Sequence, residues 1–270
     1  MPDNLTFKAR AQLSRWLRKS AYKEEFGVAE RLRSRAEQYM STLVKADAEL
    51  AYPRAVYLMT GKAYKSYCSA LFLARYGFTE DMGVVVRSLL NLDIVLKWIS
   101  SADREARAKR YLGWFWVEMH RLLTVLPAPP DMEVAIQRQY SKVKRLFEFQ
   151  SSKGRTLMPR EWHNTNIKEM ADQVGMTGYY DEYYKTLSAT EHSSALSYFG
   201  MLAESGPGGT TVIGLGDHRF LRPYLECAFV CFSEVIYVWN EVFGVMDSAV
   251  LDGELSADVE FFRAKRNVRP

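Results

Sequence analysis

Residues 179–196, YYDEYYKTLSATEHSSAL, combine a carboxylate, phenols, hydroxyls and an imidazole at helical spacing. At about 100° per residue, Asp181, Tyr184, Ser188 and His192 fall within one narrow arc of a helix. Ser188 and His192 are four residues apart, a spacing that allows a direct hydrogen bond. An imidazole titrates close to neutral pH and can act as a general acid or base. This helix face is therefore the first candidate for chemistry.

A second polar pair, Arg87 and Asn91, lies one helical turn apart in the otherwise largely apolar segment 79–100. A guanidinium stays charged at ordinary pH, so inside a bundle it needs an acceptor or a pocket. If this helix packs beside the motif helix, Arg87 can bind a phosphate group and stabilise its developing charge. The two helices together supply one candidate catalytic set: His192, Arg87, Ser188, Tyr184 and Asn91.

Two other interpretations remain open for these residues. In a serine hydrolase, His192 would activate Ser188 as a nucleophile, although a helix pair alone provides no oxyanion hole. In a purely structural network, Arg87 would pair with a carboxylate and fix the register of the bundle. The acids available for that role are Asp181, Glu191 and Asp93.

Several sharper motifs are excluded by spacing. No histidine has a glutamate three residues before it, so the Glu-x-x-His pairs of a di-iron bundle are missing, as is a zinc-type His-Glu-x-x-His. Cys227 and Cys231 share a helix face without a second ligand pair and are interpreted as core cysteines. Gly214-Leu-Gly216 lacks the Gly-Lys-Ser/Thr ending of a phosphate loop. We expect neither a metal nor a cofactor.

Helical periodicity runs through most of the chain and predicts an all-α bundle of about eight helices with an N-terminal helical arm. Gly77 is placed to end one helix, and Asn166 with Glu169 forms a capping box that opens another. The glycine-rich segment 205–217 suits a loop or a short β-ribbon. The predicted helices cover about 5–20, 24–50, 53–76, 79–100, 103–126, 131–152, 166–174, 178–203 and 219–246.

Three regions follow from this pattern: a basic amphipathic arm (1–50), a helical bundle core (51–247) and a C-terminal tail (248–270) with one or two helical turns. Apolar side chains in 28–50 recur every three or four residues. Such a stripe suits packing on a neighbouring helix, which predicts a homo-oligomer through residues 28–50 or a contact with a partner protein.

Composition is that of a globular protein, with 48% hydrophobic residues and a net charge of +4. We find no apolar run long enough to cross a membrane, no signal peptide and no disulfide framework among the three cysteines. We therefore expect a cytoplasmic protein. Residues 1–35 hold nine basic and four acidic side chains, a net +5. A basic end can attract nucleic acid, although the solvated face of a helix is the commoner meaning.

The chain resembles a bacterial helical family of uncharacterised function over about residues 53–200. The resemblance rests on residues 86–90 (VRSLL), on Trp162 before 167–171 (IKEMA), and on the pattern Tyr180-x3-Tyr184-x2-Leu187-Ser188-x3-His192. Where the family pattern has a glutamate after Leu90, this chain has Asn91, so a catalytic acid would have to come from Asp93 or Glu191.

More distantly, the chain is similar to helical nucleotide-binding domains of prokaryotic toxins and phage-defence proteins. Those domains cleave RNA without metal, using an Arg-x4-6-His motif on one helix. No histidine here has an arginine five to seven residues before it. The resemblance therefore implies action on RNA or a nucleotide through a site split between Arg87 and His192, and this is an analogy of fold.

Overall fold

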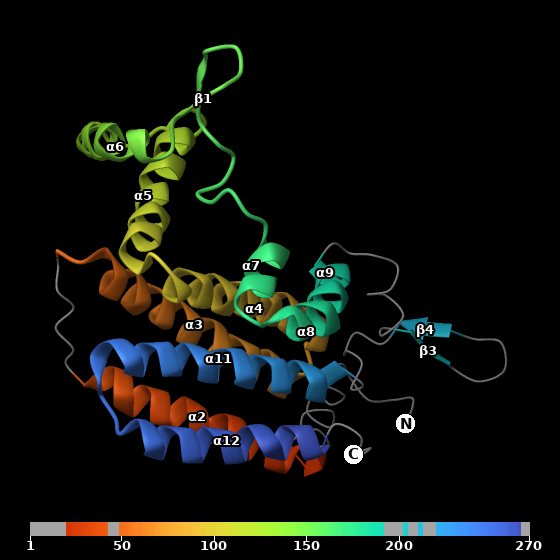
Figure 1. Cartoon of the computed structure of the whole chain (residues 1–270). Helices are drawn as coiled ribbons and strands as arrows, with labels where there is room; N and C mark the ends of the chain where they lie inside the picture. Colours follow the sequence, from red (N-terminus) through yellow and green to blue (C-terminus); the bar gives the residue numbers. More distant parts are fainter. Residues whose placement is uncertain (1–19, 43–48, 192–201, 205–209, 213–219, 266–270) are drawn as a thin grey trace.

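The structure is a computed structural model that describes residues 20–42, 49–191, 202–204, 210–212 and 220–265. Three long helices form the centre of the bundle: α3 (Ala51–Tyr76), α4 (Thr79–Ser101) and α11 (Leu221–Phe243). On the other side of α11 lie α2 (Lys23–Ser41) and α12 (Ser248–Lys265), as Figure 1 shows. The predicted all-α bundle is confirmed.

Shorter elements cover α4 and extend from it. A run of α7 (Ile167–Gln173), α8 (Thr177–Tyr179), η2 (Tyr180–Tyr184) and α9 (Lys185–Glu191) packs along α4. An arm made of α5 (Arg104–Leu122) and α6 (Pro130–Val143) projects from the bundle (Figure 1). It ends in the 3₁₀ turn η1 (Lys144–Leu146) and a hairpin of β1 (Phe149–Gln150) and β2 (Thr156–Leu157).

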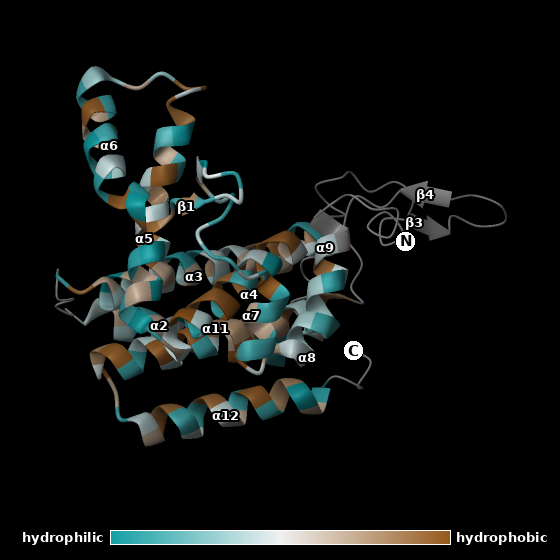
Figure 2. Ribbon diagram, turned by 45° about the horizontal axis from the view of Figure 1, so that its top comes forward, coloured by the Kyte–Doolittle hydropathy of each residue, from teal (hydrophilic) through white to brown (hydrophobic). Residues whose placement is uncertain are grey.

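The core lies where α3, α4 and α11 meet. Figure 2 shows apolar residues concentrated along these helices, and the largest side chains with almost no exposure come mainly from them. Tyr67 of α3 stacks on Phe232 of α11 with ring centroids 4.6 Å apart. The fully buried Leu89, Leu90 and Ile94 complete this layer from α4. Because α4 is apolar on most of its surface, it must be covered on several sides, and the short helices provide that cover.

The predicted helix signals hold at several termini. Gly77 ends α3 in a left-handed conformation with φ 87°, and its N–H bonds to the carbonyls of Ala74 and Leu73. Asn166 caps α7: its side chain accepts from the N–H of Glu169, whose carboxylate accepts from the N–H of Asn166.

Two predicted elements were wrong in extent, and the short β-ribbon allowed in the glycine-rich region is present. The helix expected over 131–152 ends at Val143, and the β1–β2 hairpin (β1 pairing antiparallel with β2) follows a 3₁₀ turn. The tail expected to form one or two turns is the 18-residue helix α12, because Leu251, Leu255 and Phe262 form an apolar stripe that packs on the bundle. In the glycine-rich region, β3 (Leu202–Glu204) pairs antiparallel with β4 (Thr210–Val212).

The apolar stripe expected to face a partner is largely covered by this same chain. Val28, Leu32 and Ala36 of α2 are buried in the core, Leu43 and Ala46 lie outside the described residues, and Leu50 is 46% exposed. A homo-oligomer through residues 28–50 therefore stays a prediction. Most of the described apolar side chains of this stripe already pack against other helices of the same chain. No helix among the described residues has the length and apolarity needed to cross a membrane.

Candidate functional site

Arg87 and Tyr184, 97 residues apart in the chain, meet where α4 packs against η2 and α9. The Nη2 of Arg87 donates a hydrogen bond of 3.0 Å to the hydroxyl of Tyr184. The guanidinium carbon also lies 4.8 Å from the centre of the Tyr184 ring, a cation–π contact. Both residues are half-buried. The side chain predicted for phosphate binding is thus held by a side chain of the predicted ladder.

The backbone around Tyr184 is unusual. Residues Tyr180–Tyr184 form a π-helical segment between α8 and α9, where the sequence predicted one regular helix from 178 to 203. Tyr180 stacks on Tyr184 with centroids 4.4 Å apart. π-Helical turns are rare and frequently occur at functional sites, because the inserted residue redirects the side chains that follow. Arg87 thus faces a pair of stacked phenols.

The contacts also fix the direction of the two segments. Leu187 lies one turn after Tyr184, and its Cδ2 is 3.5 Å from where a Cβ on Gly83 would be, one turn before Arg87. The segments therefore run antiparallel. That Cβ would also lie 3.0 Å from the ring of Tyr224 on α11, so glycine at position 83 allows this close approach.

Two of the sequence candidates in these segments carry a buried oxygen atom that has no hydrogen-bond partner among the described residues. These atoms are Oδ1 of Asn91, one turn beyond Arg87 on α4, and Oγ of Ser188, one turn beyond Tyr184 on α9. Buried polar atoms usually have a hydrogen-bond partner, so each of these atoms needs an explanation, such as a bound ligand or water. Since the helices run antiparallel, the two atoms belong to turns on opposite sides of the Arg87–Tyr184 contact.

The remaining sequence candidates fall differently. His192 lies outside the described residues, so the proposed acid/base group is not placed. Asp181 is exposed and lies 3.4 Å from Lys185, so it forms a surface ion pair there. Asp93 is fully buried and faces Lys97 and Glu234, whose own ion pair measures 2.9 Å.

Asp93 does not occupy the position of the missing family glutamate. Six residues separate it from Arg87, which turns it to the other side of α4. Burial in the core, with Glu234 nearby, raises the pKa of Asp93 to about 8, against the opposing effect of Lys97. This carboxyl group is therefore a neutral core group at neutral pH and not a partner of Arg87.

Sequence reasoning missed two contributors to this site. Tyr180 appears in the family pattern but was not among the candidate site residues, and only the stacking on Tyr184 reveals its place. Gly83 was overlooked because a single glycine inside an apolar helix gives a weak signal; its packing role depends on Tyr224, 141 residues away. Within the described part of the chain, no group of three His, Cys, Asp or Glu side chains could hold a metal ion.

The chain belongs to DUF5677, a family of unknown function, which matches residues 54–209. The matched region runs from α3 through α4 and the α5–α6 arm to β3, and it includes Arg87, Asn91, Tyr184, Ser188 and His192. No curated protein and no solved structure matches the chain.

Proposed function

We propose that this member of the DUF5677 family binds a phosphate group of RNA or of a nucleotide at Arg87. The RNA or nucleotide is then cleaved by metal-independent acid/base chemistry. The observation that supports this most is the half-buried guanidinium of Arg87, oriented by the hydroxyl and ring of Tyr184 at a π-helical turn. A guanidinium presents several donors in one plane and matches phosphate oxygens.

For RNA, the proposed reaction is an internal transesterification. His192 takes the proton of a ribose 2′-hydroxyl, the O2′–P bond forms and the P–O5′ bond breaks. The leaving 5′-oxygen then receives a proton from the imidazolium or from water. Arg87 stabilises the negative charge that develops on the non-bridging oxygens. The products are a 2′,3′-cyclic phosphate and a 5′-hydroxyl end.

The other residues of the set orient the substrate. Tyr184 fixes the guanidinium plane through its hydrogen bond. Asn91 and Ser188 each offer a buried oxygen atom without a partner among the described residues, and these oxygens can accept from ribose hydroxyls. Asn91 cannot replace a catalytic acid, so His192 is the one side chain to which the proposed chemistry assigns proton transfer.

The test is cleavage of total cellular RNA in a chelating buffer by the full chain, beside His192→Ala and Arg87→Ala. Removal of one charge-stabilising donor lowers catalytic rates by roughly 100- to 1,000-fold in characterised enzymes, and we expect a loss of that order for each variant. Lys168→Ala, an exposed cation on α7, is the control and should cleave normally. Circular dichroism checks the folding of each variant, and the end groups of the products check the chemistry. Cleavage that survives both substitutions would refute the proposal.

The toxin or phage-defence role implied by the resemblance has its own test. Expression of the wild-type chain should slow bacterial growth, and Arg87→Ala should relieve the effect at equal protein level. Equal toxicity of the two chains would show that the growth effect does not depend on Arg87.

A non-enzymatic interaction module is the second candidate. It is favoured by the fact that the Arg87–Tyr184 contact also joins α4 to η2, as a buried register device would. In that case RNA stays intact and Arg87→Ala lowers stability. Light scattering on the full chain should then give a mass above the 31.1 kDa of one copy, alone or with a partner protein.

A further inference from the structure

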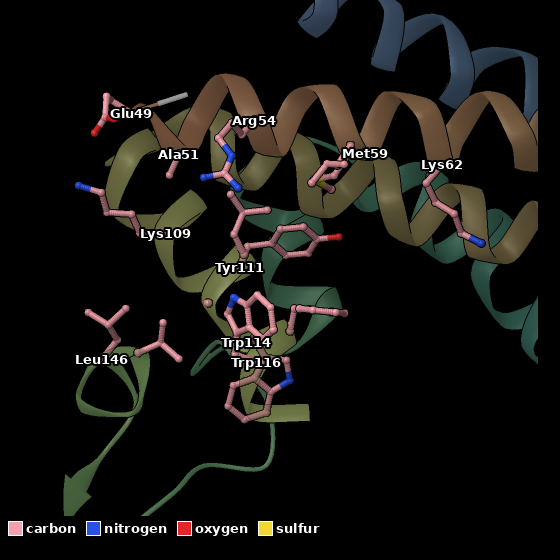
Figure 3. Close-up of a pocket in the computed structure, with 15 residues that line it drawn as sticks. Glu49, Ala51, Arg54, Met59, Lys62, Lys109, Tyr111, Trp114, Trp116 and Leu146 are labelled. Carbon is pink, nitrogen blue, oxygen red and sulfur yellow. The ribbon is translucent and has the colours of Figure 1, made fainter. Parts of the chain in front are cut away.

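A pocket of about 800 Å³ lies between the first half of α3, the middle of α5, and the end of α6 with the turn η1 that follows it. Figure 3 shows Arg54 and Lys62 of α3 on one side of it, and Tyr111 and Trp114 of α5 on the other. Its size falls within the range of small-molecule sites. None of its lining residues belongs to the Arg87 site.

The walls of this pocket are fixed by contacts with neighbouring elements. The carboxylate of Glu105 on α5 accepts the N–H groups of Ala51 (2.8 Å) and Tyr52 (2.9 Å) at the start of α3. The Trp114 ring lies 5.1 Å from that of Phe147 and is covered by the guanidinium of Arg121 at 4.8 Å. The pocket therefore exists before any ligand binds.

Positive charge borders the pocket. Arg54, Lys62 and Lys109 are exposed, and Glu49 is the one acid that lines it. Lys109 lies 3.5 Å from Glu105, but Arg54 and Lys62 have no ion pair within the described part of the chain. A phosphate group could approach these two side chains without breaking an existing pair.

Aromatic surface accompanies this charge. Phe115 is 55% exposed, and its ring meets that of Trp116 edge-on at 5.0 Å. Leu58 on the opposite wall is also 55% exposed. Exposed rings beside cations are the composition of sites that stack bases and hold the sugar-phosphate backbone.

The arm around the pocket is the most basic described part of the molecule. Residues 104–165 hold twelve basic and six acidic side chains, a net charge of +6 in a chain whose total is +4. Lys142, Lys144 and Arg145 flank Val143 and Leu146, which line the pocket. The positive charge thus continues from the pocket onto α6 and the turn that follows.

One end of the pocket, at Lys62, lies beside the part of α4 that carries Arg87. The hydroxyl of Tyr52 donates to Ser100 at 2.9 Å, so the start of α3 lies beside the end of α4 and the two helices are antiparallel. Ten residues along α3 from Tyr52, about 15 Å, Lys62 reaches the level of Leu90, one turn from Arg87.

We infer that this pocket binds single-stranded nucleic acid, with phosphates at Arg54, Lys62 and Lys109 and a base stacked at Phe115. The inference rests on the proposed function for the choice of ligand, and it adds a substrate-binding surface outside the cleavage site. It names single strands because stacking on Phe115 requires an unpaired base, whereas a duplex offers only phosphates.

The test is fluorescence anisotropy of a labelled 2′-O-methyl oligouridylate of roughly 12 nucleotides, a length that covers one typical single-strand site. The missing 2′-hydroxyl prevents transesterification, so binding is measured without cleavage. Lys62→Glu and Phe115→Leu are the test variants. Lys65→Glu is the matched control, because Lys65 is an exposed lysine of the same helix that does not line this pocket and lies instead at a separate hollow with Cys68 and Phe72.

Lys62→Glu is expected to weaken binding about tenfold or more at low salt, and Lys65→Glu to change it by less than about twofold. Phe115→Leu keeps the apolar bulk but loses the flat face, and should weaken binding at least about fivefold. Each lost phosphate contact lowers the slope of log affinity against log salt by about 0.7, so Lys62→Ala should show a shallower slope.

Three results would overturn the inference: no binding by the wild-type chain, equal loss in Lys62→Glu and Lys65→Glu, or unchanged binding in Phe115→Leu. The last would leave a simple charged surface, such as one for an acidic protein. Arg87→Ala separates the two proposals. If it binds the oligonucleotide normally and no variant ever cleaves RNA, the cleavage proposal fails and this inference stands. If RNA is cleaved and Lys62→Glu leaves the KM for long RNA unchanged, the reverse holds.

Discussion

At the scale of single residues, Tyr184 contacts Arg87 in two ways, through its hydroxyl and through its ring. Tyr184→Phe removes the hydrogen bond and keeps the cation–π contact. A hydrogen bond to a charged group contributes about 1.5–3 kcal/mol, and half-burial places this one near the low end, so we expect a loss of about 1.5 kcal/mol in the free energy of unfolding. Urea denaturation measures it. Tyr180→Phe, which changes the stacked neighbour, is the control, and an equal loss in both variants would contradict the assigned role of the hydroxyl.

Asp93 makes stability depend on pH. The unfolded chain releases the proton of this side chain near its ordinary pKa of 3.8, whereas the folded protein keeps it up to about pH 8. Between these values the folded state binds more protons, so the free energy of unfolding falls as pH rises, by up to about 1.4 kcal/mol per unit.

Asp93→Asn should abolish this slope and leave the protein more stable than wild type at pH 8 but not at pH 4. Urea midpoints across that range measure the difference, with Asp81→Asn as an exposed control on the same helix. A variant whose stability falls with pH as steeply as wild type would contradict the burial argument.

At this scale, the sequence could predict which residues of the site matter and on which helical turn each one lies. Arg87 stood out because a charge in an apolar helix needs a reason, and Tyr184 because it lay in the polar ladder. The partner could not be predicted, since it depends on which helix packs where. The candidate acids were Asp181, Glu191 and Asp93, and the structure places Asp181 beside Lys185 and Asp93 in the core.

At the scale of elements, a buried ion pair joins α2 to α11. Arg222 lies 2.9 Å from Glu25, and their side chains are 9% and 3% exposed. Glu25→Ala leaves the guanidinium buried without its carboxylate, and such a change costs about 3–5 kcal/mol. The adjacent Glu24 pairs with Lys265 at the surface, where solvent screens the two charges and the pair contributes little to stability.

Denaturant unfolding of Glu25→Ala and Glu24→Ala therefore compares neighbouring acids with opposite burial. Similar losses in the two variants would show that α2 is not anchored through this pair.

Helix boundaries were predictable where a local signal existed, as at Gly77 and at Asn166 with Glu169. The π-helical turn at Tyr180–Tyr184 was not, because nothing in local propensity distinguishes one inserted residue from a regular turn. The length of α12 was also missed. Its apolar stripe contains few residues, so the pattern in the sequence is weak. Its stability comes from packing on α11 and from Asp258, which pairs with Arg31 at 2.7 Å.

At the scale of the whole molecule, the N-terminal region behaves as part of the bundle where it is described. A chain without residues 1–50 would lose five buried apolar side chains of α2: Phe26, Val28, Ala29, Leu32 and Ala36. Burial of one large apolar side chain contributes about 1.5–3 kcal/mol, and a whole domain is stable by about 5–15 kcal/mol. We expect this truncated chain to unfold without a cooperative transition, measured by circular dichroism in urea. A sharp transition close to that of the full chain would show that residues 1–50 form a separate unit.

We propose that Arg87 stabilises charge on a bound phosphate, and the most direct test is the single-turnover rate of RNA cleavage by wild type, Arg87→Lys and Arg87→Ala. Lysine keeps the charge but loses the planar array of donors, so we expect wild type to be fastest, then lysine, then alanine, with roughly 100-fold or more between the extremes. Equal rates in all three folded proteins, or no cleavage of any RNA by wild type, would contradict it.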